Sequence, residues 1–338
     1  MTSDSTASGQ TAGATSPDSP RSIVSLGGGH GLYQTLLADR ACGPEEIHAV
    51  VTVADDGGSS GRIRRELGII PPGDLRMALA ALASEDEHGR MWGKTLQHRF
   101  GGTGALAGHA VGNLLIAGLT EVLGSELQAL DAVAALTRSH GRVLPVCSQP
   151  LEIEADVSGL DDDPRVMLPV RGQVAVATTP GSVRRVRIIP GDPMANPAAI
   201  SAIRQADMIT LGPGSWFSSV IPHLLVPAVV EAITTSDAFR VVVLNLNAEV
   251  GETSGFSLER HIHMLCQHAP ALKVDLILVD GAHNPTTSDR RHMTRAADAL
   301  GAKVVFHDLR EVGPGGQRTD RHDPAKLAAA MLHNYRDR

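Results

Sequence analysis

The 338-residue sequence predicts an α/β protein with a Rossmann-like, doubly wound, mostly parallel sheet and a small antiparallel β insert. Short β-branched runs alternate with segments of helical spacing along most of the chain. Several of these runs end in glycine-rich turns, as in the mononucleotide-binding βαβ unit. Between about residues 142 and 190 the pattern changes to short β-like runs separated by Gly, Pro and Asp, which indicates the insert.

The ordered part of the chain begins with a βαβ unit. Ser22–Leu26 is expected to form the first strand, and Gly27–Gly31 turns it into a helix over Leu32–Ala38. The second strand is expected at Ile47–Val53, and it ends in a loop rich in Asp, Gly and Ser. Helices are then expected at Leu75–Ala83, His109–Leu123 and Leu127–Ser139.

The predicted insert is followed by a return of the α/β alternation. Its β-like runs are Val143–Val146, Leu151–Val157, Val174–Thr178 and Val183–Ile189. After it, strands are expected at Met208–Leu211, Arg240–Leu246, Val274–Val279 and Lys303–Phe306. Helices are expected at Ala198–Gln205, Val220–Thr234 (in two parts), Leu258–Gln267 and Pro324–Asn334. The strands are apolar throughout, which is typical of a parallel sheet covered on both faces.

We expect a single domain over residues 21–338, preceded by a disordered tail. Residues 1–20 are dominated by Ser, Thr, Gly, Ala and Pro, which cannot bury apolar surface, and they lack the features of a signal peptide. The apolar stretches of the chain are too short to span a bilayer or are broken by Pro. The three cysteines show no CxxC pair, which excludes a disulfide framework and a zinc ribbon. The sequence therefore predicts a cytoplasmic protein without membrane insertion.

The charge and aromatic content argue against a nucleic-acid partner. The formal net charge is −7, whereas proteins that bind nucleic acid usually present a basic face. Aromatic residues make up 3% of the chain, so several stacking platforms for bases are not expected. A small-molecule ligand is favoured instead.

Three glycine turns, Gly27–Gly31, Gly57–Gly61 and Gly212–Ser215, are candidate phosphate sites. Glycines let the backbone approach a phosphate, and the N–H groups of the following helix attract negative charge. All three turns should lie at the carboxyl edge of the parallel sheet, where open α/β folds bind ligands. The alternatives are a tight strand–helix connection at the first turn and capping by Ser218 or Ser219 at the third. The expected contacts are Gly28, Gly29, His30, Gly31, Gly212, Gly214 and Ser215.

Acidic residues follow the second strand. Asp55 and Asp56 stand close to where a dinucleotide fold places its ribose-binding acid. They could instead hold a divalent metal, with Asp74 adding a further oxygen ligand. We expect one of the pair to face the ligand and the other to hold the loop. Asp74 has a second interpretation as the N-cap of the helix that follows it.

Basic and polar residues follow in the same region. Arg62 comes directly after the Gly/Ser loop and suits an anionic ligand, because a guanidinium group grips phosphate with two hydrogen bonds. Ser59 and Ser60 could donate to phosphate oxygens or merely turn the chain. The alternative for the arginine is a solvated basic surface.

Three further polar residues interrupt apolar segments. His109 and Asn113 are spaced one helical turn apart in an apolar stretch, so both side chains must find partners, either a ligand or core groups. Asn245 ends the strongly apolar strand and could read a nucleobase or a sugar hydroxyl, or cap the adjacent loop.

Together these segments resemble a known family. The matching motifs are Gly27–Leu32, Val51–Arg76, Gly108–Leu115, Leu211–Ser215, Ser219–Pro222 and Gly251–Thr253. They are similar to the YvcK family of gluconeogenesis factors, which is related to the 2-phospho-L-lactate transferases and shares their Rossmann-like fold. The resemblance implies a cytoplasmic bacterial protein that binds UDP-sugars, notably UDP-N-acetylglucosamine. It implies a regulator linked to cell-wall precursor supply and cell shape rather than an established enzyme.

The resemblance also implies partners and one more site residue. A metabolic enzyme of amino-sugar synthesis is a candidate partner, and a homo-oligomer is left open. Arg321 matches a family segment linked to UDP-sugar binding, although the residues around it read as a polar, glycine-containing loop. His30 stands where the family usually has Thr. Pro324 follows where some members carry a phosphorylatable Thr.

Two rival functions remain open at this point. One is a Mg²⁺-dependent 2-phospho-L-lactate transferase-like enzyme with its metal on Asp56 and Asp74. Its relatives keep further acids near Asp74, which this chain lacks. The other is an NAD-binding protein, which is favoured by the first glycine turn alone.

Overall fold

The computed structural model describes residues 19–163, 165–247, 253, 256–283 and 285–338. The predicted disorder of residues 1–20 falls almost entirely outside these ranges and stays a prediction. Of the motif at residues 251–253, only Thr253 is described.

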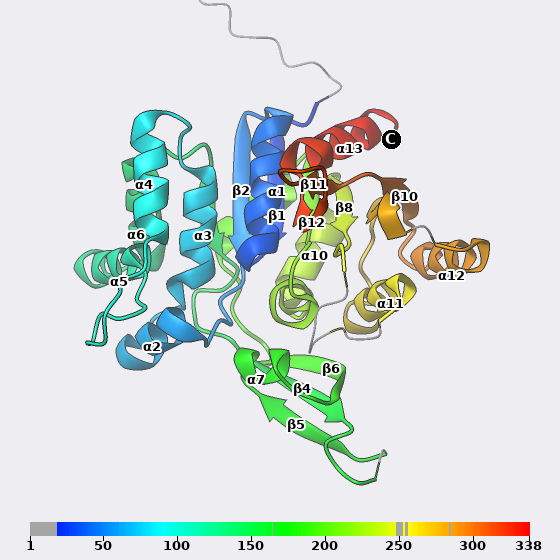
Figure 1. Ribbon diagram of the computed structural model, residues 1–338, viewed down its shortest axis with the longest axis horizontal. Coiled ribbons are helices and arrows are strands. Elements are labelled where there is room, and N and C mark those ends of the chain that lie inside the picture. The colour runs from blue at the N-terminus through cyan, green and yellow to red at the C-terminus, as the bar shows by residue number, and fades with distance from the viewer. Residues whose placement is uncertain (1–18, 164, 248–252, 254–255, 284) are drawn as a thin grey trace, which may run out of the picture.

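A seven-stranded sheet forms the centre of the molecule, and it confirms the predicted fold class (Figure 1). The strand order is β3-β2-β1-β7-β8-β9-β10, and every neighbouring pair is parallel. The chain adds strands outward from β1 in one direction and then, from β7, in the other. The carboxyl ends of β1 and β7 therefore flank a topological switch point, where such sheets bind ligands. The strands are β1 (Ser22–Gly27), β2 (Glu46–Val51), β3 (Arg142–Pro145), β7 (Met208–Leu211), β8 (Phe239–Val243), β9 (Leu276–Asp280) and β10 (Lys303–His307).

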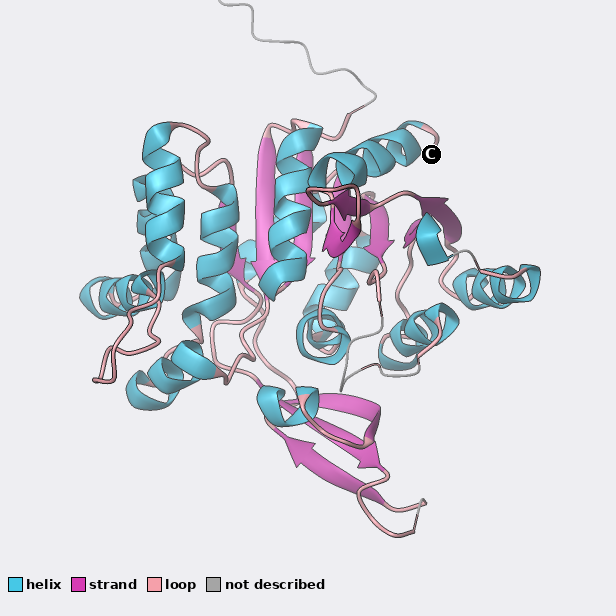
Figure 2. Cartoon of the chain, in the orientation of Figure 1, coloured by secondary structure: helices cyan, strands magenta, loops and turns pink. Residues whose placement is uncertain are grey.

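Helices cover both faces of this sheet (Figure 2). Alternate residues of each strand point to opposite faces, so Ile23 and Val241 pack with Leu327, while Val24 and Val242 belong to the larger core on the other face. The helices are α1 (Gly29–Cys42), α2 (Gly58–Leu67), α3 (Pro72–Leu82), α4 (Glu87–Gln97), α5 (Val111–Leu123), α6 (Glu126–Leu136), α8 (Pro197–Gln205), α9 (Ile221–Leu224), α10 (Pro227–Thr235), α11 (Leu258–His268), α12 (Thr287–Asp298) and α13 (Pro324–Arg336). Among the described residues no single helix is long and apolar enough to cross a membrane, although the bent pair Trp216–Leu224 and Pro227–Thr235 passes that test by length and composition.

The predicted insert exists, but it is smaller than expected. It is an antiparallel sheet of β4 (Glu152–Ser158), β5 (Met167–Arg171) and β6 (Ser182–Ile189), in the order β5-β4-β6. Figure 2 shows it projecting from the body of the molecule. The chain leaves and returns at neighbouring points, because Cys147 and Ala195 form an antiparallel bridge and the Asn196 N–H donates to the Val146 carbonyl at 2.9 Å.

Two of the runs expected to be strands of the insert have other structures. Val143–Val146 supplies most of β3, which pairs in parallel with β2 in the main sheet. Val174–Thr178 was expected as a strand and lies largely in the short helix α7 (Gln173–Ala177). The physical reason is a distant carboxylate, because Asp56 accepts hydrogen bonds from the first N–H groups of that helix.

Some elements were not expected at all. The loop predicted after Asp56 contains α2, the segment between the predicted runs Leu151–Val157 and Val174–Thr178 contains β5, and helices α4 and α12 were not anticipated. The loop predicted around Arg321 is instead a hairpin of β11 (Arg310–Val312) and β12 (Arg318–His322). These segments are rich in Gly, Ser, Pro or charged residues, so local preference gives little sign of the pairing that tertiary contacts impose.

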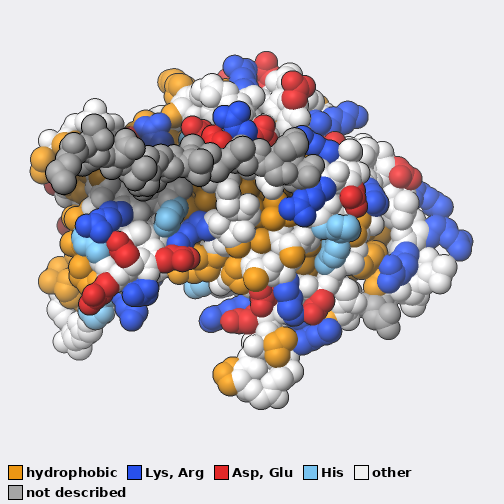
Figure 3. All heavy atoms as spheres, turned by 90° about the horizontal axis from the view of Figure 1, so that it is seen from above, with side chains coloured by type: hydrophobic (Ala, Val, Ile, Leu, Met, Phe, Trp, Pro, Cys, Tyr) orange, Lys and Arg blue, Asp and Glu red, His pale blue; other side chains and the backbone are white. Residues whose placement is uncertain are grey.

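Charges are mixed on the face of the molecule that is seen from above. Lys and Arg side chains are interspersed there with Asp and Glu side chains (Figure 3).

Candidate functional site

A cleft of about 800 Å³ lies at the topological switch point. Its wall combines residues that follow three neighbouring strands with residues of α3 and β12. It includes His30 and Gly31 after β1, Gly214 after β7, Arg76 of α3 and Arg321 of β12. Sequence segments that are far apart, including the first and third predicted glycine turns, thus meet in one place, whereas Gly57–Gly61 is not among the described residues that line this cleft.

The first and third glycine turns touch each other. A Cβ atom on Gly31 would overlap the backbone of Pro213 and Gly214, so only glycine allows this approach. The Thr35 hydroxyl lies 3.2 Å from the Gly31 carbonyl and 3.3 Å from the Gly212 carbonyl, which ties the turns together. Gly28 is the N-cap position of α1 and Gly29 has a φ of 57°. The structure therefore brings these two predicted phosphate turns together at the amino end of α1.

Asn245 holds the third turn in place. Its amide oxygen accepts from the Gly214 N–H and its amide nitrogen donates to the Gly214 carbonyl, each at 2.9 Å. The structure shows the loop-holding contacts of Asn245, and because Asn245 also lines the cleft, its contact with a ligand stays a prediction. In the same turn the Ser215 and Ser218 hydroxyls are hydrogen-bonded to each other.

A chain of buried hydrogen bonds runs from α2 through α5 to the cleft. Arg76 Nε donates to Asn113 Oδ1 at 3.0 Å, and Asn113 Nδ2 donates to Ser59 Oγ at 3.0 Å. The Ser59 hydroxyl lies 3.0 Å from His109 Nδ1. Because Ser59 Oγ accepts from Asn113 and, at 3.4 Å, from the Ala110 N–H, its own proton is left for His109, whose Nδ1 then acts as the acceptor. Burial and the nearby Arg62 lower the pKa of His109, which agrees with a neutral ring.

Three predicted ligand contacts therefore act behind the cleft wall. Ser59, His109 and Asn113 are buried and orient Arg76. The prediction that His109 lies on the helix was wrong: α5 begins at Val111, because Ala110 forms an antiparallel bridge with Arg99.

Arg76, like Arg99, is one of the cleft residues that sequence reasoning did not single out. Its side chain is only 3% exposed, and none of the ion pairs in the described part of the chain includes it. Burial lowers the pKa of its guanidinium to about 10, so it stays charged at neutral pH. The charges of Asp74 and Asp55 act on Arg76 from beyond ion-pair distance, and a buried cation on a cleft wall with no carboxylate within that distance favours an anionic ligand. The available signal was a single cation inside the apolar run Leu75–Leu82.

The predicted acids lie beside the cleft and hold backbone segments. Asp55 Oδ1 accepts from the Gly57 N–H at 2.9 Å, and Asp56 accepts from the N–H groups of Gln173 and Val174 at 2.9 and 3.0 Å. Both carboxylates are thus used on the backbone, whereas one was expected to face the ligand. Neither belongs to the described residues that line the cleft.

Asp74 lies in the first turn of α3, whose N-cap position is Pro71, so its interpretation as the N-cap was wrong. It accepts a hydrogen bond from the Gly29 N–H, and burial together with the charge of Asp55 raises its pKa to about 7. The predicted metal pair, Asp56 and Asp74, makes separate backbone contacts here and stays a prediction. Among the described residues no group of three or more His, Cys, Asp and Glu side chains could hold a metal ion.

The predicted arginines differ in their placement. Arg62 donates to the Ala107 carbonyl at 2.8 Å and fixes the loop before α5. Ser60 accepts from the Gly73 N–H at 3.0 Å and supports the start of α3. Arg321 does line the cleft, between Asp320 and His322, but it lies on a strand rather than in a loop.

Comparison with known proteins identifies the family. The model of the family described as 2-phospho-L-lactate transferase CofD matches residues 23–319. A Mycobacterium leprae protein described as "Putative gluconeogenesis factor" is 57% identical over 316 residues, which cover 94% of this chain and 86% of that protein. The "Gluconeogenesis factor" of Halalkalibacterium halodurans is 34% identical over 321 residues, 92% of this chain and 96% of that one.

A solved structure agrees. The crystal structure of a UPF0052 family member from Bacillus halodurans has a TM-score of 0.79 and 32% identity, and the match covers 92% of this chain and 98% of that one. The chain therefore belongs to the CofD family, and within it to the gluconeogenesis factors that the YvcK-like motifs predicted.

Proposed function

We propose that this protein binds a nucleotide sugar of the UDP-N-acetylglucosamine class in the switch-point cleft. One observation carries the proposal, which is the buried, charged Arg76 side chain on the cleft wall. Arg99 and Arg321 line the same cleft, so three cations can face a diphosphate. Guanidinium groups form charge-assisted hydrogen bonds with phosphate oxygens. The volume of about 800 Å³ is within the range of small-molecule sites.

The glycine turns support the same ligand. Gly31 and Gly214 bring their backbones into contact at the amino end of α1, where N–H groups favour negative charge. The diphosphate would lie across these turns with Arg321 on the opposite wall. A sugar and a base would extend along the cleft toward Asn247 and Gln97, which also line it.

We further propose a regulatory role in the cytoplasm. The relatives described as gluconeogenesis factors and the resemblance to the YvcK family support a role in cell-wall precursor supply and cell shape. A metabolic enzyme of amino-sugar synthesis is the partner that this role favours. The binding of Asp55 and Asp56 to backbone N–H groups also favours binding over catalysis.

Calorimetric titration tests the proposal. The wild-type chain is titrated with UDP-N-acetylglucosamine, NAD and GDP, each with and without Mg²⁺. We expect the UDP-sugar to bind most tightly and Arg76→Gln to weaken it by about ten- to a hundredfold. Arg295→Gln, an exposed substitution on α12, is the matched control and should leave the affinity unchanged. Preference for NAD over the UDP-sugar, or undiminished affinity in Arg76→Gln, would overturn the proposal.

The family description favours one other candidate. Because the CofD model matches residues 23–319, a 2-phospho-L-lactate transferase-like activity is the alternative. Incubation with an activated phospholactyl donor and a deazaflavin alcohol, with Mg²⁺ present, tests it. Transfer that disappears in Asp56→Asn would replace the regulatory proposal.

A further inference from the structure

The β11–β12 hairpin carries three residues of the cleft wall but is weakly held by itself. It supplies Asp320, Arg321 and His322 to the cleft. Its two strands pair at Arg310 with His322 and at Val312 with Arg318, with an irregularity between these pairs, and the flanking Gly313 N–H donates to the Gln317 carbonyl at 2.9 Å. Isolated two-stranded hairpins are marginally stable in water. Contacts outside the hairpin must therefore fix its position.

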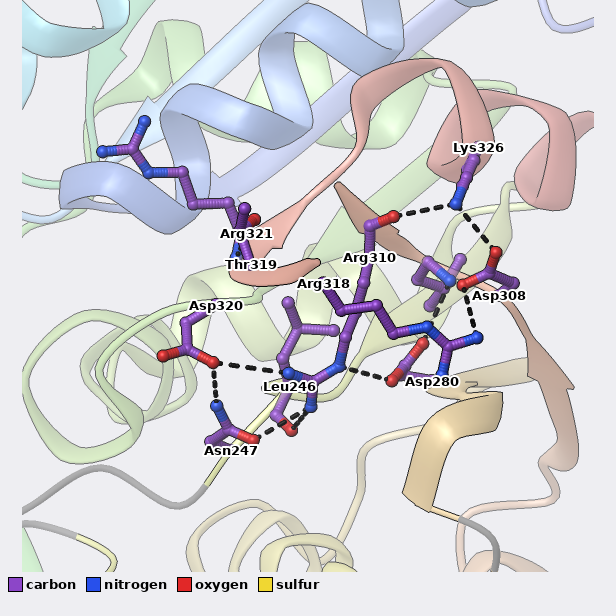
Figure 4. A network of polar contacts seen from close by, with 11 residues as sticks. Leu246, Asn247, Asp280, Asp308, Arg310, Arg318, Thr319, Asp320, Arg321 and Lys326 are labelled. Atoms are coloured by element: carbon purple, nitrogen blue, oxygen red, sulfur yellow. Dashed lines mark hydrogen bonds and ion pairs between the residues drawn. The ribbon is translucent and has the colours of Figure 1, made fainter. Parts of the chain in front are cut away.

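The Arg310 side chain supplies several of these contacts, beside the Lys326 ammonium group, which donates to the Arg310 carbonyl at 2.9 Å (Figure 4). The Arg310 side chain is 12% exposed and reaches from β11 to the carboxyl ends of β8 and β9. It donates to Asp280 Oδ2 at 2.8 Å, to the Leu246 carbonyl at 2.6 Å, to Asn247 Oδ1 at 2.9 Å and to Asp320 Oδ1 at 3.4 Å. One side chain thus joins two strand ends of the parallel sheet to both strands of the hairpin.

The partners of Arg310 reinforce the same junction. Asp280 is fully buried, and its second oxygen accepts from the Leu309 N–H at 3.0 Å. Asn247 Nδ2 donates to Asp320 Oδ1 at 2.6 Å. Figure 4 shows Arg321 extending from the hairpin away from this network. The network fixes the backbone beside Arg321, while the Arg321 guanidinium points away from the network.

We infer that Arg310 is a positioning residue for the cleft, because it anchors the β11–β12 hairpin on β8 and β9 and so holds Arg321 at the wall. Arg310 itself does not belong to the described residues that line the cleft. Its planar, forked group meets acceptors on several elements at once, which an ammonium group cannot match. The inference rests on the proposed function only for the identity of the ligand.

The first test needs no ligand. Hydrogen exchange of the full-length protein is measured over residues 310–322 in wild type and in Arg310→Lys, which keeps a charge beside buried Asp280. We expect at least tenfold faster exchange over β12 in Arg310→Lys. Arg318→Lys, the same exchange on an exposed residue of the same hairpin, should match the wild type. Unchanged exchange in Arg310→Lys would overturn the inference.

A second variant, Asn247→Ala, keeps the inference testable if Arg310→Lys does not fold. It removes contacts to Arg310 and Asp320 without leaving a buried charge, because Asn247 is exposed. We expect it to accelerate exchange over β12 in the same direction as Arg310→Lys. Exchange at the wild-type rate in Asn247→Ala would also count against the inference.

The second test uses UDP-N-acetylglucosamine. We expect Arg310→Lys to lower the affinity by about tenfold and the double variant with Arg321→Ala to lose little more than Arg321→Ala alone. Full additivity would show that Arg310 does not act through Arg321. Absence of binding in the wild type would instead refute the proposed function, while the exchange measurement would still decide the role of Arg310.

Discussion

Replacing Asn113 by aspartate tests whether Arg76 carries the charge that the cleft offers to a ligand. The change exchanges one amide NH₂ for an oxygen and keeps the shape of the side chain. Arg76 Nε already lies 3.0 Å from Asn113 Oδ1, so Asn113→Asp turns the hydrogen bond between a cation and a neutral amide into a buried ion pair. Ser59 can then donate to the new carboxylate, and His109 can donate from Nδ1 to Ser59. The hydrogen-bond chain reverses with every partner satisfied.

The expected effect is large on binding and small on stability. A hydrogen bond from a charged group contributes about 1.5–3 kcal/mol, and the new ion pair competes for that interaction. The affinity for UDP-N-acetylglucosamine should therefore fall by about ten- to a hundredfold. Buried ion pairs are close to neutral for folding when their geometry is good, so the free energy of unfolding should change by about 1 kcal/mol or less.

Calorimetric titration measures the affinity of Asn113→Asp for UDP-N-acetylglucosamine, and a melting curve measures its stability. Asn196→Asp is the control for a new buried charge, because Asn196 is buried, caps α8 through Oδ1 and lies outside the set of described residues that line the cleft. Aspartate is an equally good cap, so this variant should bind like the wild type. A folded Asn113→Asp protein with wild-type affinity would refute the role given to Arg76.

Four further outcomes are expected. Gly31→Ala should separate the two glycine turns, lowering both UDP-sugar affinity and the free energy of unfolding by about 1–3 kcal/mol, as measured by titration and denaturation. Gly118→Ala on α5, where a Cβ meets no described atom within 4 Å, should instead stabilise by about 0.5–1 kcal/mol; destabilisation there would contradict the packing argument. Burial raises the pKa of Asp39 to about 7, so the folded chain keeps this proton to a higher pH than the unfolded chain and stability from this group is lost as pH rises. Asp39→Asn should therefore melt above the wild type at pH 8 and approach it at pH 5, and a constant difference would argue against a buried carboxylate charge. Arg321→Ala should weaken UDP-sugar binding by about ten- to a hundredfold while the ligand-free melting temperature holds, and a large drop in that temperature would make its role structural.

The parallel sheet was largely readable from sequence because its strands are buried on both faces. Met208–Leu211 shows this, since every residue is apolar or small and the strand was predicted with the same bounds. Pairing partners were harder. Val143–Val146 looks like any short β run, and its local sequence does not say whether it joins β2 or the insert.

The site was only partly readable, for a related reason. The first and third glycine turns could be predicted because close contact between two backbones requires glycine at Gly31, and this requirement leaves a visible glycine run in the sequence. The direction of polar side chains depends on N–H groups contributed by distant segments, as with Asp56 and α7 or Asn245 and Gly214. Arg76 was overlooked because the charge of one arginine says nothing about its burial until α5 supplies Asn113.

The bridge between Cys147 and Ala195 has a consequence for chain entropy. The ends of the insert already lie side by side. A longer turn between β4 and β5 therefore adds only the entropic cost of closing a longer loop. That term grows with the logarithm of loop length, and each doubling raises the free energy by only about 0.6 kcal/mol. The insert can therefore vary in length while the register of β3 and β7 in the parallel sheet stays the same.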